Sequence, residues 1–187
     1  LFRAPIEVPV ATAFGTMTNR PALFLRVSAS DGAWGWGEVF CNFPQVGAEH
    51  RARLIDSMFA PLLQGSPSDD PPRLRQRLEE QTRRMAIQCG EPGPFAQIIG
   101  AVDQALWDLV ARRAGLPLWK LLAAGPDEGG NRVRVYASGL GPDRVAETAL
   151  RKKAEGFAAF KFKVGFTAGR DKANFAEIRA ALGNEAV

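Results

Sequence analysis

The first forty residues alternate apolar and polar side chains in a pattern that predicts β-strands. The run RPALFLRVSA at 20–29 is rich in Leu, Phe and Val, and AWGWGEVF at 33–40 resumes the pattern after the turn signal SDG at 30–32. Two such runs with a short, glycine-containing connection are typical of an antiparallel hairpin. We expect an earlier strand at about 2–9, and the small, polar stretch 11–20 predicts a mobile loop between that strand and the hairpin.

The residues that follow repeat apolar positions every three or four residues, which is the pattern of helices packed by one face. We predict helices over 48–63 and 68–85, the second of which opens with acidic residues followed by proline. The strongest helix covers 94–115, and Gly115 and Pro117 end it. Its apolar stripe consists of Phe95, Ile98, Ile99, Val102, Leu106, Leu109 and Val110.

After the glycine-rich stretch at 125–131, strands and helices alternate, which is typical of parallel βαβ units. A two-stranded parallel sheet covers neither its edges nor its faces, so we expect this domain to continue beyond Val187. The chain also begins with Leu1 rather than Met, so we expect that an upstream part has been removed. The predicted strands are 132–139 and 158–165, and the predicted helices that follow them are 142–156 and 169–183.

Composition excludes several classes of protein. Of the 187 residues, 46% are hydrophobic, which suffices for a buried core, and the net charge of +4 comes from basic residues interleaved with acids. The densest basic stretch, 73–84, contains two glutamates and is interpreted as a solvated helix face, so we expect no nucleic-acid partner. No apolar run approaches the ~20 residues of a membrane span. Cys41 and Cys89 form neither a disulfide framework nor a zinc pattern and favour a reduced, cytoplasmic setting.

The second predicted strand of the alternating region carries two lysines, Lys161 and Lys163, on one face. Phe160, Phe162 and Val164 lie on the other face, because side chains alternate along a strand. An exposed edge strand would explain such lysines as protection against aggregation. The βαβ context favours another interpretation, in which the aromatic face meets helices and the lysines point into a barrel, near the strand end where barrel enzymes place their chemistry.

A pair of inward lysines has a specific chemical use. Two neighbouring ammonium groups repel each other, which favours the loss of a proton from one of them, and partial burial adds to this effect. A lysine that is neutral near pH 7 can accept a proton. Its charged neighbour can bind a carboxylate. The pair therefore suggests a base beside a site for an anion.

Four segments together carry a resemblance to a known family. They are DGAWGWGE at 31–38, AVDQALWDLVARRAGLPLWKLL at 101–122, VYASG at 135–139 and KFKVG at 161–165. In this order the chain resembles the N-terminal half of an enolase-superfamily protein of the mandelate racemase/muconate lactonizing enzyme type.

The resemblance implies the fold class and the domains. We expect an α+β capping domain followed by the start of a modified (β/α) TIM-type barrel that is incomplete in this chain. Residues 1–128 would form the capping domain, a three-stranded antiparallel sheet with helices. Residues 129–187 would form the first two βα units of the barrel.

The resemblance also implies the chemistry. Enzymes of this superfamily remove the proton α to a carboxylate and stabilise the enediolate with a divalent metal, usually Mg²⁺. Lys163 matches the second lysine of the family's Lys-x-Lys motif and would be the acid/base. Lys161 matches the first, which neighbours the substrate carboxylate and helps to keep its partner neutral. The metal ligands of the family lie on later barrel strands, so we expect no metal ligand in this chain.

Substrate contacts are expected from three places. Ser138 follows the first barrel strand and is a candidate for contacting the carboxylate, although a serine there is also an ordinary turn residue. Two capping-domain loops, at about 12–20 and 40–46, would set specificity. The residues of these loops that we expect to contact the substrate are Phe14, Thr16, Met17, Cys41, Asn42 and Phe43.

The expected substrate is a small carboxylate, and the expected assembly is a homo-oligomer. Racemisation or epimerisation and dehydration of an α-hydroxy acid or acid sugar are the leading outcomes. Cycloisomerisation and dipeptide epimerisation are the alternatives within the superfamily. If the chain ended at Val187, it would instead be a non-catalytic module that associates with a partner.

Overall fold

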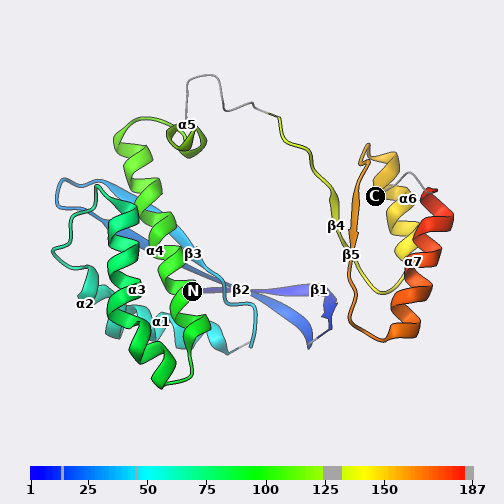
Figure 1. The fold of residues 1–187 in the computed structure, drawn as a ribbon, viewed down its shortest axis with the longest axis horizontal. Helices are drawn as coiled ribbons and strands as arrows, with labels where there is room; N and C mark the ends of the chain where they lie inside the picture. Colours follow the sequence, from blue (N-terminus) through cyan, green and yellow to red (C-terminus); the bar gives the residue numbers. More distant parts are fainter. Residues whose placement is uncertain (14, 45, 124–131, 184–187) are drawn as a thin grey trace. The chain divides into compact units, whose positions relative to one another are not determined.

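The described residues of the computed structural model are 1–13, 15–44, 46–123 and 132–183 (Figure 1). They form two compact units. The first comprises Leu1–Pro5 and Asn19–Gly129, and the second comprises Ile6–Thr18 and Gly130–Val187. The predicted boundary between residues 128 and 129 lies outside the described residues and stays a prediction.

A three-stranded sheet contains β1 (Phe2–Thr12), β2 (Gly15–Ser28) and β3 (Trp34–Val39), in that order. Strands β2 and β3 are antiparallel, as predicted, with Leu25 opposite Gly37. The expectation of a mobile loop at 11–20 is wrong, because β1 continues to Thr12 and β2 already begins at Gly15. The threonines of this stretch are β-branched and suit strands, and the prediction gave too much weight to its small, polar character.

The helices of the first unit follow the predicted apolar repeats. A nearly continuous helical segment is followed by two long helices, and the Asp70 side chain accepts a hydrogen bond from the Arg73 N–H to cap the first of these. None of the helices in the described part of the chain is long and apolar enough to cross a membrane. The helices are α1 (Gly47–Leu54), the π-helix η1 (Ile55–Phe59), α2 (Ala60–Leu63), α3 (Pro71–Gln88), α4 (Pro92–Arg113) and α5 (Leu118–Leu122).

Helix α4 packs directly on β3 because two glycines leave room for it. Gly35 and Gly37 face the helix, and a Cβ atom on either would collide with a backbone carbonyl, that of Ala105 or Ala101 respectively. Their neighbours Trp34 and Trp36 point to the other face of the sheet and are exposed. The core of the first unit therefore depends on residues without side chains at two positions of an otherwise aromatic strand.

The same helix also closes the outer edge of the sheet. The backbone N–H of Trp36 donates to Asp108 Oδ2 at 2.9 Å, and that of Glu38 donates to Gln104 Oε1 at 3.2 Å. Both acceptors lie on α4. These N–H groups of an edge strand are thereby satisfied by side chains, so they are not left to pair with another chain.

The second unit contains two βα units with a parallel strand pair, as predicted. Buried residues of the strands and helices, among them Leu140, Val145 and Ile178, form one core cluster. The strands are shorter than the predicted 132–139 and 158–165. Val133 and Val135 are largely exposed and precede the first strand. The elements are β4 (Ala137–Leu140), α6 (Val145–Ala154), β5 (Phe160–Phe162) and α7 (Ala168–Leu182).

Replacing Gly37 by Ala should destabilise the complete protein. The added Cβ would overlap the Ala101 carbonyl and push α4 away from β3, so we expect the free energy of unfolding to fall by about 3 kcal/mol. Gly100→Ala is the matched control, because a Cβ there meets nothing within 4 Å. Removing a glycine from the helix should raise the free energy of unfolding by about 0.5 to 1 kcal/mol. Urea denaturation measures both, and a Gly37→Ala protein as stable as the wild type would contradict this packing.

Candidate functional site

A bulge in β4 shapes the barrel face of the second unit. Ala137 pairs with Phe160 and Leu140 pairs with Phe162, so Ser138 and Gly139 together stand opposite the single residue Lys161. Gly139 has a φ of +83°, which a glycine adopts without strain. The extra residue lets Ala137 and Leu140 both enter the core, and it leaves Ser138 exposed. The bulge therefore sets Ser138 beside the first of the two lysines.

Lys161 lies on the face of β5 that the core does not use. Its neighbours Phe160 and Phe162 pack against the helical core, as predicted for the aromatic face. The Lys161 Nζ donates a hydrogen bond to the Tyr136 hydroxyl at 3.3 Å and lies 5.1 Å from the centroid of the tyrosine ring. Val164 was expected on the aromatic face, but it is 58% exposed because β5 ends at Phe162.

Tyr136 is a candidate site residue that the sequence reasoning did not single out. It immediately precedes β4 and holds Lys161 through both its hydroxyl and its ring. A signal for it was present in the sequence. Tyr136 and Ser138 stand two apart, and such residues share a face of an extended chain.

Lys163 is held by a different part of the chain. It follows β5, where its backbone N–H donates to the Leu140 carbonyl at 3.0 Å. Its Nζ donates to the backbone carbonyl of Ala11 at 2.8 Å, and the side chain is half-buried. Ala11 belongs to a segment that we call the hairpin tip, the described residues of Ile6–Thr18, where β1 ends and β2 begins. This segment lies in the second unit.

The turn after Lys163 is fixed from helix α7. The Gly165 N–H donates to Asp171 Oδ2 at 2.7 Å, and Asp171 lies in the first turn of the helix. The Thr167 side chain caps the same helix by accepting from the Arg170 N–H. Gly165 has a φ of +97°, so a residue with a side chain would be strained there. The glycine backbone and the hydrogen bond from α7 together fix the path of the chain after Lys163.

The predicted substrate contacts of the hairpin tip have different environments. Thr16 is exposed, whereas Met17 is 4% exposed and belongs to the interior. Phe14 lies outside the described residues. The assignment of these residues to substrate binding stays a prediction, with Thr16 the more accessible of the two that are described.

The predicted contacts of the second loop lie in the first unit. Cys41 is only 2% exposed and belongs to the hydrophobic core, and burial raises the pKa of its thiol. Asn42 and Phe43 are half-buried and can present part of their side chains to solvent. Cys41 packs in the core of the first unit in this structure, and its assignment to substrate binding stays a prediction.

A metal site is not formed by the described residues. Within 1–13, 15–44, 46–123 and 132–183, no three His, Cys, Asp or Glu side chains are close enough to bind one ion. The single histidine, His50, instead forms an exposed pair with Glu91 at 2.7 Å. Mg²⁺ prefers oxygen ligands, usually one or two carboxylates together with water, and the described residues form no cluster of three or more such side chains.

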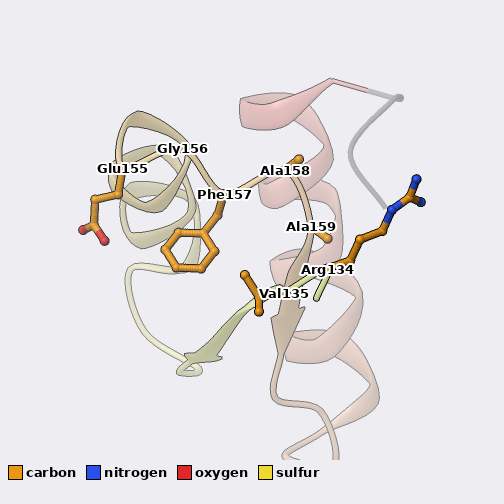
Figure 2. A pocket seen from close by; sticks show the side chains of 7 residues that line it. All are labelled: Arg134, Val135, Glu155, Gly156, Phe157, Ala158 and Ala159. Carbon is orange, nitrogen blue, oxygen red and sulfur yellow. The ribbon is translucent and has the colours of Figure 1, made fainter. Parts of the chain in front are cut away.

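A hollow of about 580 Å³ in the second unit lies away from the lysines. Figure 2 shows the side chains that line it, around the segments that lead into the two strands. Val135 precedes β4, and Ala159 precedes β5, so the hollow lies at the amino ends of the strands. Barrel enzymes use the carboxyl ends. The hollow is thus not the candidate site, which consists of Tyr136, Ser138, Lys161, Lys163 and the hairpin tip.

A family model matches the N-terminal part of the chain. Residues 2–123 match the model described as the N-terminal domain of mandelate racemase / muconate lactonizing enzyme.

Curated relatives align with most of the chain. A D-galactonate dehydratase of Ralstonia nicotianae is 33% identical over 87% of this chain and 42% of its own length. A D-galactarolactone cycloisomerase of Agrobacterium fabrum is 27% identical over 95% of this chain and 46% of its own length. The chain spans less than half the length of these relatives.

Solved structures share the fold. A mandelate racemase/muconate lactonizing enzyme from Bordetella bronchiseptica RB50 has a TM-score of 0.81 at 50% identity, over 90% of this chain and 45% of its own. A racemase from Streptomyces coelicolor A3(2) with bound magnesium also has a TM-score of 0.81, at 30% identity, over 99% of this chain and 51% of its own.

The two cysteines should differ in reactivity toward iodoacetamide. The raised pKa of the Cys41 thiol leaves less thiolate at pH 8, and burial blocks the reagent, whereas Cys89 is exposed. We expect Cys89 to be modified at least about a hundredfold faster than Cys41 in the folded, complete protein. Peptide mass spectrometry measures both rates. Similar rates would contradict this burial and would mean that Cys41 is accessible, as a substrate contact has to be.

Proposed function

The chain belongs to the mandelate racemase/muconate lactonizing enzyme family of the enolase superfamily, and from this premise we propose that the complete protein abstracts the proton α to a carboxylate, with Lys163 as the base. The observation that carries the proposal is the position of the two lysines. Lys161 lies in β5, on the face that the hydrophobic core leaves free, and Lys163 immediately follows the strand, at its carboxyl end.

The proposed substrate is an acid sugar or α-hydroxy acid. The names of the relatives support this class, because they include a D-galactonate dehydratase and a D-galactarolactone cycloisomerase. Dehydration and racemisation or epimerisation are the leading outcomes of our proposal, and cycloisomerisation is the alternative. All three begin with the same loss of an α-proton, so the assignment of Lys163 does not depend on which one follows.

The proposed first step breaks the α-C–H bond and forms an N–H bond at the Lys163 Nζ. The electron pair of the broken bond moves into the carboxylate, which becomes an enediolate with two negative charges to stabilise. The Lys161 ammonium would bind one carboxylate oxygen, and the exposed Ser138 hydroxyl could donate to it. The intermediate would then regain a proton at the α-carbon, or it would break the bond to its β-hydroxyl, which takes a proton from a general acid of the complete protein and leaves as water.

Mg²⁺ is proposed as the cofactor of the complete protein. A related racemase has bound magnesium in its solved structure, and such an ion would stabilise the charge of the enediolate. The described residues form no cluster of three or more His, Cys, Asp or Glu side chains. The roles that we propose for this chain are proton transfer, binding of the carboxylate and substrate selection, the last through Thr16, Asn42 and Phe43.

Lys163→Ala should abolish exchange of the substrate α-proton with deuterated water in the complete protein. The change removes the only group in our proposal that takes the proton, so we expect a loss of at least about a thousandfold. Lys172→Ala, on the exposed face of α7, is the control and should keep the wild-type rate. Proton NMR of a panel of acid sugars in deuterated water measures the exchange. Undiminished exchange in Lys163→Ala would refute the assignment.

Tyr136→Phe should slow the same reaction without abolishing it. The variant keeps the ring beside Lys161 and removes only the hydroxyl that accepts its hydrogen bond. Because a single hydrogen bond to a charged group is lost, we expect the rate of α-proton exchange to fall by about tenfold. A rate equal to that of the wild type would mean that Lys161 is oriented by other groups.

A further inference from the structure

The hairpin tip contacts the proposed base through its backbone. The Lys163 Nζ donates to the Ala11 carbonyl at 2.8 Å, across a separation of 152 residues. Two further contacts involve the hairpin tip. The Thr12 hydroxyl donates to the Gly15 carbonyl at 2.6 Å within the tip itself, and the Ala13 Cβ lies against Gly165 of the second unit.

A carbonyl is suited to holding a lysine that changes its protonation state. The ammonium form has three N–H donors, and the neutral amine still has two. One of them can point to the Ala11 carbonyl in either form. A carbonyl only accepts hydrogen bonds, so the lone pair of the neutral amine must point elsewhere. The contact can thus hold the position of Nζ and keep its lone pair directed away from Ala11 through a complete catalytic cycle.

We propose that the backbone carbonyl of Ala11 is the positioning group for Lys163, which makes the hairpin tip part of the proton-transfer apparatus. This inference rests on the proposed function of Lys163 as the base. The hairpin tip would then have two separate tasks: its backbone orients the base, and exposed side chains such as Thr16 face the substrate. Substrate selection can change through these side chains without moving the base, because the carbonyl is common to every residue.

The packing of Ala13 on Gly165 supports this assignment. A Cβ built on Gly165 would lie 3.1 Å from the Ala13 Cβ, which is tighter than ordinary contact. Gly165 is also anchored to α7 through Asp171. The hairpin tip therefore rests on the turn that immediately follows the base, two residues from Lys163, and any side chain added at this contact would lift it from the lysine.

Hydrogen–deuterium exchange in the complete protein tests the contact independently of catalysis. In Lys163→Met the hairpin tip loses its hydrogen bond, and we expect amides in the peptide covering residues 6–18 to exchange about fivefold faster or more. Lys161→Met is the matched control. Its Nζ bonds to Tyr136 instead, so the same peptide should exchange at the wild-type rate. Equal exchange in the two variants and the wild type would overturn the proposed contact.

Kinetics of an Ala13 variant test whether the contact positions the base. Ala13→Leu adds bulk against Gly165 and should displace the Ala11 carbonyl, so we expect kcat for α-proton exchange to fall by about tenfold or more, with KM within about twofold. Lys172→Ala, on the exposed face of α7, is the control and should stay within about twofold of the wild-type kcat. A change in KM alone would overturn the proposal, because it would mean that the hairpin tip acts only on substrate binding.

The two proposals fail in different ways. If Lys163→Met retains α-proton exchange, the assignment of the base is wrong. If Lys163→Met abolishes that exchange but neither the hairpin-tip amides nor the kcat of Ala13→Leu changes, the base stands and only the role of the Ala11 carbonyl is refuted.

Discussion

The burial of Phe160 and Phe162 against the helices of the second unit is the interaction on which the candidate site depends. Successive side chains of a strand point to opposite faces, so packing these two rings on the core directs Lys161 to the free face. Phe162 also contacts the Phe175 ring of α7, at a centroid distance of 6.1 Å. A shift of one residue along β5 would bury a lysine and expose both rings, and the hydrophobic effect opposes this strongly.

The polar residues of the site around β5 are positioned by different features of the fold: a β-bulge, a side-chain contact and a turn. The bulge at Ser138–Gly139 brings the serine opposite Lys161, and Tyr136 holds the ammonium of that lysine. The glycine turn after Lys163, anchored by Asp171, gives the hairpin tip a surface to rest on. Such support from backbone and neighbouring side chains is what a proton-transfer site needs, since small displacements of the base are costly.

The sequence predicted those parts of the fold and site that depend on local periodicity. The three strands of the N-terminal sheet, the long helices and the parallel βα units all have patterns of period two or about 3.6. The spacing of Lys161 and Lys163 likewise places both residues on one face of an extended chain. The bulge in β4 was not predicted, because one extra residue in a short strand does not produce a recognisable pattern of apolar and polar positions. The burial of Cys41 was likewise not predictable from its place in a loop, because burial depends on long-range packing.

The contact between Lys163 and Ala11 was equally inaccessible to sequence reasoning, because a backbone carbonyl has no residue-type signature. It also joins positions 152 residues apart. Tyr136 was predictable only in part. Its spacing from Ser138 was visible in the sequence, but its hydrogen bond to Lys161 depends on the strand register.

The most direct test of the central claim is a crystal structure of the complete protein with an unreactive acid-sugar hydroxamate, which imitates the enediolate. The quantity to measure is the distance from the Lys163 Nζ to the carbon that corresponds to the α-carbon. Our account predicts about 3 to 3.5 Å, the separation of reacting atoms before proton transfer. A ligand bound with this carbon beyond the reach of Lys163, or at the amino ends of the strands, would contradict it.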